Sequence, residues 1–231
     1  MPEIFARSRS AGVRGWVLGG VHPGDWPDQQ QLRLAYGASV LRCVGLHPWW
    51  VSHQTCSDIQ LALEQFAELV PTADGIGEIG LDRCAHFHTP EAQQRQDFAI
   101  QGALELSRYA QKPIVLHVVR AHGAILQLLD RWGPFPQGGM VHGFSGSPET
   151  AREYLKRGFL ISVGLGALKK GYGQLKKTIA ILDEAEFLLE TDSHEPADLV
   201  KVATAVGNLR KTTPEDVLRK SSLNLRRLFE I

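Results

Sequence analysis

Seven short apolar runs, separated by amphipathic segments, constrain the fold of this chain more than any other feature of its sequence. Each run is almost continuously apolar rather than alternating, which is typical of parallel strands covered on both faces. The runs occupy residues 16–21, 40–46, 75–81, 113–119, 139–144, 159–164 and 187–191. Alternation of strands and helices at this spacing predicts right-handed βαβ units, and therefore an α/β fold.

The helical segments between these runs have recognisable ends. Ser147, Pro148 and Glu149 predict an N-cap, a proline at the first helical position and an acid in the first turn. Thr213 and Pro214 begin the last helix in the same way. Other helices are predicted over residues 57–70, 90–111, 121–132 and 195–207. No linker rich in Pro, Gly or Ser interrupts the 231 residues, so a single domain over residues 1–231 is expected.

Two architectures fit this alternation, an open doubly wound sheet and a TIM-type (β/α)8 barrel. An open sheet usually carries a glycine-rich phosphate loop after an early strand, but residues 19–24 do not match G-x-G-x-x-G, and no P-loop motif occurs. A barrel places polar functional residues at the C-terminal ends of several strands. Because this chain has that pattern, the barrel is the favoured prediction.

One acid stands inside an otherwise apolar strand, in the stretch GIGEIGLD at residues 75–82. Burying the carboxylate of Glu78 without a partner would be costly, so a positive charge is expected beside it. An arginine would serve for this residue alone. Polar residues at the ends of the other strands favour a different partner.

Histidines and carboxylates recur where the predicted strands end. They are His47, Glu78, Asp82, His117, His142 and Asp192. Singly, each has an ordinary interpretation: a histidine in a strand is usually a hydrogen-bonded core residue, and Asp192 could cap the next helix. Jointly, two histidines and two carboxylates (Glu78, His117, His142 and Asp192) are a ligand set for a divalent ion such as Zn, Mn or Mg.

Several neighbouring residues have more than one interpretation. His47, before Pro48, is either a turn residue or a substrate-binding one. Arg120 follows His117, where its guanidinium could bind a phosphate oxygen. Asp82 could orient a metal ligand or neutralise Arg83. His194 lies two residues after Asp192 and is a further candidate.

Composition narrows the class of protein. Lys plus Arg and Asp plus Glu are both 25, so a polyanionic substrate would have to meet a local positive site, for example a metal ion. Three cysteines without CxxC spacing argue against a disulfide framework and against a cysteine zinc site. No leader-like segment or apolar run of 18 residues occurs, so the expected location is the cytoplasm.

Several motifs in order make the sequence similar to a known family. They are GLHP (45–48), GEIGLD (77–82), PIVLHVVRAH (113–122), VHGFSGSPETAREYLKRGFLISVG (141–164) and LLETDS (188–193). The chain resembles the TatD family of metal-dependent hydrolases and deoxyribonucleases, from about residue 4 to its end. The resemblance implies a TIM barrel of the amidohydrolase superfamily with one or two metal ions.

The resemblance also implies roles for individual residues. Glu78 would be the carboxylate shared by two ions, and His117 and His142 would ligate one of them. Asp192 would ligate the other ion or accept a proton from the attacking water. His47 and Arg120 would line the site and contact substrate phosphate. The implied reaction is hydrolysis of phosphodiester bonds in DNA.

One departure from the family pattern is large. The family begins with a strand carrying Asp-x-His-x-His, and no such motif precedes Trp16, which leaves seven predicted strands where a barrel has eight. The chain is then expected to be an N-terminally truncated version of a normal member, or else a divergent one. With that motif absent, at most one tightly bound ion and weak or absent phosphodiesterase activity are expected. A hydrolase of lactones or amides, and a non-catalytic accessory protein, stay open as alternatives.

Overall fold

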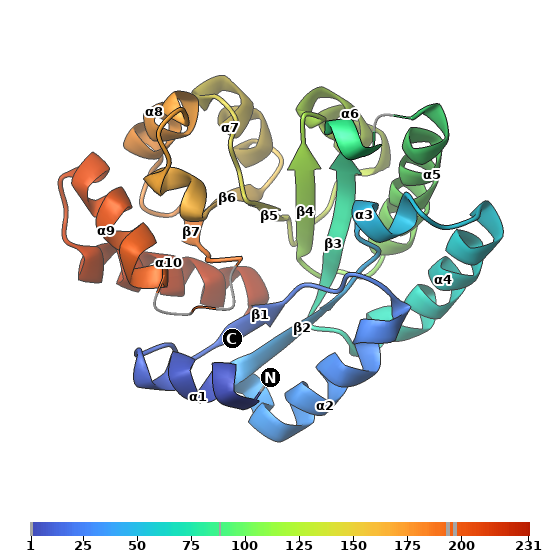
Figure 1. Cartoon of the computed structure of the whole chain (residues 1–231), viewed down its shortest axis with the longest axis horizontal. Coiled ribbons are helices and arrows are strands. Elements are labelled where there is room, and N and C mark those ends of the chain that lie inside the picture. The colour runs from blue at the N-terminus through green and yellow to red at the C-terminus, as the bar shows by residue number, and fades with distance from the viewer. Residues whose placement is uncertain (1, 88, 193–194, 196–197) are drawn as a thin grey trace. The chain divides into compact units, whose positions relative to one another are not determined.

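The computed structural model describes residues 2–87, 89–192, 195 and 198–231. Its parallel strands alternate with helices, as predicted for an α/β protein (Figure 1). The strands within the described residues are β1 (Trp16–Leu18), β2 (Val40–Val44), β3 (Gly75–Asp82), β4 (Ile114–Val119), β5 (Gly139–His142), β6 (Phe159–Val163) and β7 (Phe187–Leu189). Every one of them falls inside a predicted apolar run or extends it by a single residue.

Among the described residues, one helix precedes β1, and the others lie between the strands or after β7. They are α1 (Pro2–Ser10), α2 (Trp26–Tyr36), α3 (Pro48–Val51), α4 (Cys56–Leu69), α5 (Pro90–Ser107), α6 (His122–Trp132), α7 (Pro148–Leu155), α8 (Gly173–Ile181), α9 (Asp198–Arg210) and α10 (Pro214–Phe229). The chain forms two compact units, which are called the first unit (residues 15–140) and the second unit (residues 1–14 and 141–231).

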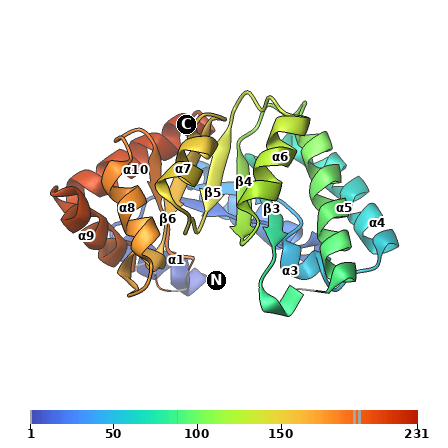
Figure 2. The same ribbon diagram turned by 90° about the horizontal axis from the view of Figure 1, so that it is seen from above.

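The first unit contains the parallel strands β1 to β4 in chain order. The apolar side chains of Ile76, Ile79 and Leu81 on β3 are fully buried, which explains why this run is continuously apolar. Helix α5 packs against β3, with α4 and α6 as its neighbours (Figure 2). The register pairs Gly80 with His117, so β3 and β4 bring their polar residues to the same end of the sheet.

Local sequence sets the ends of the helices in this unit. Thr55 and Asp58 form a reciprocal capping box at the start of α4. Thr89 caps α5 by accepting a hydrogen bond from the N–H of Ala92, and Pro90 takes the first helical position.

The second unit contains β6 and β7 as a parallel pair, with Ile161 opposite Phe187. Ser147 caps α7, and Thr213 caps α10, both as predicted. Helix α10 packs on α9 and on β7. The side-chain amide of Asn224 on α10 donates to the carbonyl oxygen of Phe187 at 2.8 Å, which ties the last helix to the strand.

The structure differs from the predicted elements mainly at their ends. Several strands stop before the predicted run ends; β7, for example, ends at Leu189 and leaves Glu190 beyond the strand. The helix predicted over 195–207 runs from Asp198 to Arg210 instead. Helices α2, α3 and α8 lie outside the helical segments that the sequence predicted.

The cysteines and the helices bear on two expectations, one about disulfides and one about membrane-spanning segments. The three cysteines, Cys43, Cys56 and Cys84, are all free thiols. Among the described helices, none combines the length and the apolar character needed to cross a membrane.

Candidate metal centre

The first unit brings together the side chains of His47, Glu78 and His117. Nε2 of His47 lies 3.1 Å from Nδ1 of His117 and 3.5 Å from Oε2 of Glu78. The same carboxylate oxygen lies 3.7 Å from Nδ1 of His117. One possible ligand atom from each residue lies within 4.8 Å of the others, which is a spacing that a metal ion can fill. Both histidines are buried, so the surrounding protein shields them from solvent.

Asp82 orients the His117 ring from the other side. Its Oδ2 lies 3.3 Å from Nε2 of His117 and accepts a 2.6 Å hydrogen bond from the indole N–H of Trp49. Burial alone would raise the pKa of the Asp82 carboxyl, but hydrogen bonds from the His117 ring, the Trp49 indole and the Cys84 backbone hold it well below its usual range. Asp82 is therefore an ionised acceptor, 2% exposed, in contact with the imidazole.

These partners assign the tautomers of the two histidines. A carboxylate facing Nε2 of His117 places the proton on that nitrogen and leaves the lone pair of Nδ1 directed toward Glu78. Nδ1 of His47 accepts a hydrogen bond from the backbone N–H of Trp49, so neutral His47 carries its proton on Nε2. His117 and Glu78 thus offer lone pairs to a cation, whereas His47 offers an N–H.

The neighbouring glycine Gly19 makes room for Glu78. A Cβ atom built at this position would lie 2.5 Å from Oε1 of Glu78, well inside van der Waals contact. A side chain at residue 19 would therefore displace the Glu78 carboxylate from its present position.

The second unit holds a parallel arrangement around His142, at the end of β5. Nδ1 of His142 lies 2.9 Å from Oε2 of Glu190, which places the proton on Nδ1 and the lone pair on Nε2. Glu190 also accepts hydrogen bonds from the backbone N–H of Gly143 at 2.8 Å and from the hydroxyl of Ser162. The His142 ring, the Gly143 N–H and the Ser162 hydroxyl thus donate three hydrogen bonds to the Glu190 carboxylate, which in turn orients the His142 ring.

Asp192 lies beside the other nitrogen of the same ring. Its Oδ2 lies 3.6 Å from Nε2 of His142, and its side chain is 76% exposed. The backbone of Asp192 has a φ of +46°, a left-handed conformation uncommon outside glycine. His142 and Asp192 together offer an imidazole nitrogen and a carboxylate oxygen, both of them common ligands of Zn and Mn.

The remaining predicted residues have separate outcomes. Arg120 follows β4 with a φ of +53°, and its side chain is exposed. Asp82 contacts His117 rather than Arg83, because the Arg83 guanidinium pairs with Asp97. His194 lies outside the described residues.

Sequence reasoning assigned no role to Glu190 or to Trp49. Glu190 stands at a strand end two residues before Asp192, so its position on the strand was the available signal. For Trp49 no pattern in the sequence reveals that its indole reaches Asp82, 33 residues later in the chain.

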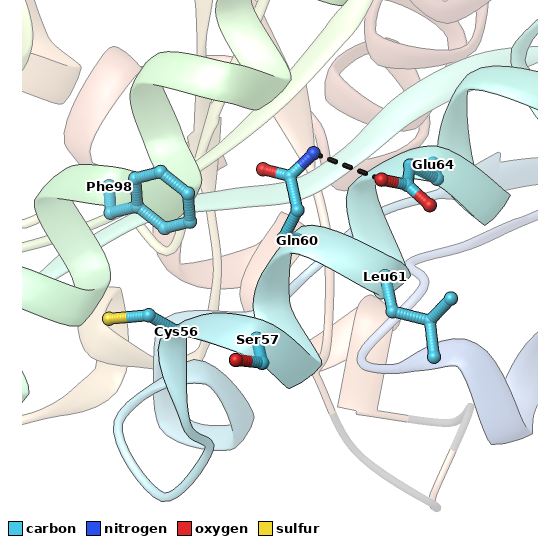
Figure 3. Close-up of a pocket in the computed structure, with 6 residues that line it drawn as sticks. All are labelled: Cys56, Ser57, Gln60, Leu61, Glu64 and Phe98. Carbon is cyan, nitrogen blue, oxygen red and sulfur yellow. Dashed lines mark hydrogen bonds between the residues drawn. The ribbon is translucent and has the colours of Figure 1, made fainter.

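A concave region lies on the surface of the first unit. Cys56, Ser57, Gln60, Leu61 and Glu64 of α4 line it, with Phe98 of α5 (Figure 3). The side-chain amide of Gln60 donates a hydrogen bond to the Glu64 carboxylate at 3.2 Å (Figure 3). It contains no histidine and no pair of carboxylates, so the polar cluster beside β3 and β4 is the better candidate for chemistry.

Comparison with curated proteins finds relatives along nearly the whole chain. The 3'-5' ssDNA/RNA exonuclease TatD of Citrobacter koseri is 28% identical over 246 residues, covering 99% of this chain and 92% of the relative. The protein of the same name from Salmonella typhimurium is 29% identical over 249 residues, with 99% and 92% covered.

Solved structures share the fold. A crystal structure of a TatD homologue from Escherichia coli superposes with a TM-score of 0.89 at 24% identity, covering 100% of this chain and 92% of that one. A TatD-family hydrolase from Entamoeba histolytica gives a TM-score of 0.81 at 16% identity, with 97% and 87% covered. The fold is therefore the TatD-like TIM-barrel type that the sequence predicted. A family model described as TatD-related DNase matches residues 1–230, and the chain belongs to that family.

Proposed function

We propose that this protein is a divalent-metal-dependent hydrolase that cleaves phosphodiester bonds in DNA. The observation that carries the proposal is the Asp82–His117–Glu78 arrangement, in which a buried carboxylate orients an imidazole whose other nitrogen faces a second carboxylate. Carboxylate–histidine pairs of this kind are typical of metal ligands. The curated relatives, named as exonucleases of single-stranded DNA and RNA, support a single-stranded nucleic acid as the substrate.

The donor chemistry of the residues fits a divalent cation. In the first unit, Glu78 and His117 are proposed as ligands of such an ion, and in the second unit His142 and Asp192 are proposed as ligands. When bound, such an ion lowers the pKa of a coordinated water and offsets negative charge on a phosphate. Zn, Mn and Mg are all compatible with this mixed nitrogen and oxygen set.

The other residues act on the substrate or on the ligands. The Nε2–H of His47 can donate a hydrogen bond to a phosphate oxygen, and the guanidinium of exposed Arg120 can bind a second one. Asp192, exposed and acceptor-only when ionised, is positioned to take up a proton. Asp82 and Glu190 keep the two imidazoles in the tautomers that ligation needs.

A depletion and reconstitution experiment tests the function. The purified chain is stripped with EDTA, reloaded separately with Zn, Mn and Mg, and incubated with end-labelled single-stranded DNA. We expect hydrolysis that depends on the added ion and that falls by at least about 100-fold in Glu78→Gln, as loss of a group acting on the reacting centre does. Glu68→Gln, an exposed acid on α4, is the matched control and retains activity.

Parallel substrates separate the proposal from other hydrolase chemistries. A lactone, an amide and a phosphotriester are offered under the same conditions. Faster turnover of any of these than of DNA would assign the chain to a different hydrolase class. Absence of hydrolysis of every substrate with every ion would favour a non-catalytic role.

A further inference from the structure

A large aromatic ring is exposed beside the buried cluster of the first unit. Trp49 lies in α3, directly after the strand β2 and next to His47, and it is 52% exposed. Single apolar side chains are common on surfaces, but this one contacts Asp82 and His47 of the polar cluster. Metal binding by Glu78 and His117 does not account for an exposed aromatic ring at this position.

Trp49 is held in one orientation despite its exposure. Its indole N–H donates to Asp82 at 2.6 Å, and its backbone N–H donates to His47 at 3.1 Å. The ring meets the imidazole of His47 edge-on, with centroids 4.9 Å apart at 75°. The His117 ring lies 6.0 Å away at 74°. The two hydrogen bonds engage the polar edge and the backbone, so the exposed surface is the apolar part of the ring.

A second ring extends this surface. Phe87, in the segment after β3, lies 6.3 Å from Trp49 between centroids and is nearly parallel to it, at 26°. The His53 ring lies edge-on to Phe87, with centroids 5.9 Å apart at 88°. Two segments far apart in sequence thus contribute rings to one aromatic surface, here called the Trp49–Phe87 surface.

We propose that the Trp49–Phe87 surface is a stacking platform for a nucleobase of the strand whose phosphate is bound beside Glu78 and His117. The inference rests on the proposed function and specifies how the substrate is held. A base is flat, uncharged and joined to its phosphate through one sugar, so a ring adjacent to the ligands is where it would lie. The chain has no net charge, and stacking supplies affinity that a basic surface would otherwise provide.

Stacking of this kind does not distinguish strongly among bases, because every base has a π-face. The platform therefore predicts tolerance of sequence together with a requirement for a base. A double helix keeps its bases stacked on each other, so the platform also favours single-stranded substrate over duplex.

Binding without hydrolysis tests the platform. In EDTA, fluorescence anisotropy gives the Kd of the full chain for a thymidine oligomer and for an abasic phosphodiester of equal length. We expect wild type to bind the base-bearing strand about tenfold more tightly, the size of one base–aromatic stack. In Trp49→Ala this ratio should fall to near one, whereas Trp49→Phe, which keeps a ring but lacks the indole N–H, should retain most of it.

The control for this binding measurement is a second exposed aromatic residue, Tyr109. Tyr109→Ala removes another exposed aromatic ring of the first unit, 79% exposed, and should leave the ratio unchanged. An unchanged ratio in Trp49→Ala, or equal loss in Trp49→Phe and Trp49→Ala, would overturn the platform; the second result would mean that Trp49 serves only to hold Asp82. Preference for the base-bearing strand without ion-dependent hydrolysis would sink the proposed function and leave the platform standing. Equal binding of the two strands by wild type would overturn the platform, whether or not the protein hydrolyses DNA.

Discussion

Nε2 of His117 lies 3.3 Å from Oδ2 of Asp82, and Nδ1 of the same ring lies 3.1 Å from Nε2 of His47. One ring therefore has an acceptor on one side and a donor on the other. Because the acceptor is a buried carboxylate, it determines which nitrogen carries the proton. We expect metal binding in the first unit to depend on this arrangement. Asp82, His117 and His47 can each be substituted separately to test it.

Removing the charge of Asp82 should weaken metal binding although Asp82 is not a proposed ligand. In Asp82→Asn the His117 ring loses the ionised acceptor that selects its tautomer. We expect zinc affinity, measured by titration calorimetry on the EDTA-stripped protein, to fall by roughly 10- to 100-fold. Asp28→Asn, an exposed acid on α2, serves as the control. Zinc affinity equal to wild type in Asp82→Asn would show that the ring needs no orienting partner.

His47 and His117 should differ in how much they contribute to metal binding. The N–H of His47 points to the lone pair that an ion on His117 would use, so His47 competes for that nitrogen rather than adding a ligand. We expect His117→Gln to lower zinc affinity by more than the roughly 10- to 100-fold typical of an outer partner, and His47→Gln to lower it by less than that. His47→Gln should instead raise the KM for DNA. Equal loss of zinc affinity in both variants would assign His47 as a ligand.

Glu190 should act through His142 in the second unit. Its carboxylate accepts from the His142 ring, from Gly143 and from Ser162, so Glu190→Gln replaces an acceptor-only group with one that carries an N–H. We expect this variant to alter the His142 ring tautomer, seen as a changed imidazole nitrogen shift in NMR, with the fold retained by circular dichroism. Ser162→Ala removes one donor alone and should change the shift less. Identical imidazole spectra in wild type and Glu190→Gln would contradict this role.

Asp216 should make stability depend on acid pH. Hydrogen bonds from Lys220 at 2.5 Å and from Arg219 at 2.6 Å lower the pKa of this carboxyl to about 2. A lowered folded-state pKa means that the stabilisation is present above the unfolded pKa of about 3.9 and is lost as the pH falls toward the folded value. In urea unfolding, Asp216→Asn should therefore be less stable than wild type near pH 5, with the gap narrowing toward pH 2.

The control for this pH effect is Asp183→Asn, another exposed acid of the second unit. Its stability difference from wild type should change less over the same range. A gap between Asp216→Asn and wild type that widens on acidification would reverse the expected sign.

Much of the secondary structure follows from local sequence. Continuous apolar runs predicted all seven described strands, because buried parallel strands need apolar side chains on both faces. Ser147 and Thr213 predicted helix starts, since a capping hydroxyl and a following proline act within one turn. Helix α2 has Asp25 before its first residue and Pro27 in its first turn but no capping side-chain hydrogen bond, and α8 has neither a cap nor a proline.

The candidate ligands were recognisable for a related reason. Glu78, His117 and His142 are polar residues within predicted apolar strands, and Asp192 follows directly after another, so each interrupts or closes a run of apolar residues. Joint ligation of one ion by residues of both units stays a prediction. For the first unit, the structure brings Glu78 and His117 to 3.7 Å, as the shared site requires.

The partners of these residues could not be read from the chain. Asp82 had two possible roles, and the structure distinguishes them because Arg83 pairs with Asp97 while Asp82 contacts His117. Trp49 reaches Asp82 across 33 positions of sequence, and Glu190 reaches Ser162 across 28. Residue types and strand periodicity thus specify which groups can carry chemistry. Tautomers, orienting carboxylates and the exposed aromatic surface arise from contacts between distant segments, which no local pattern encodes.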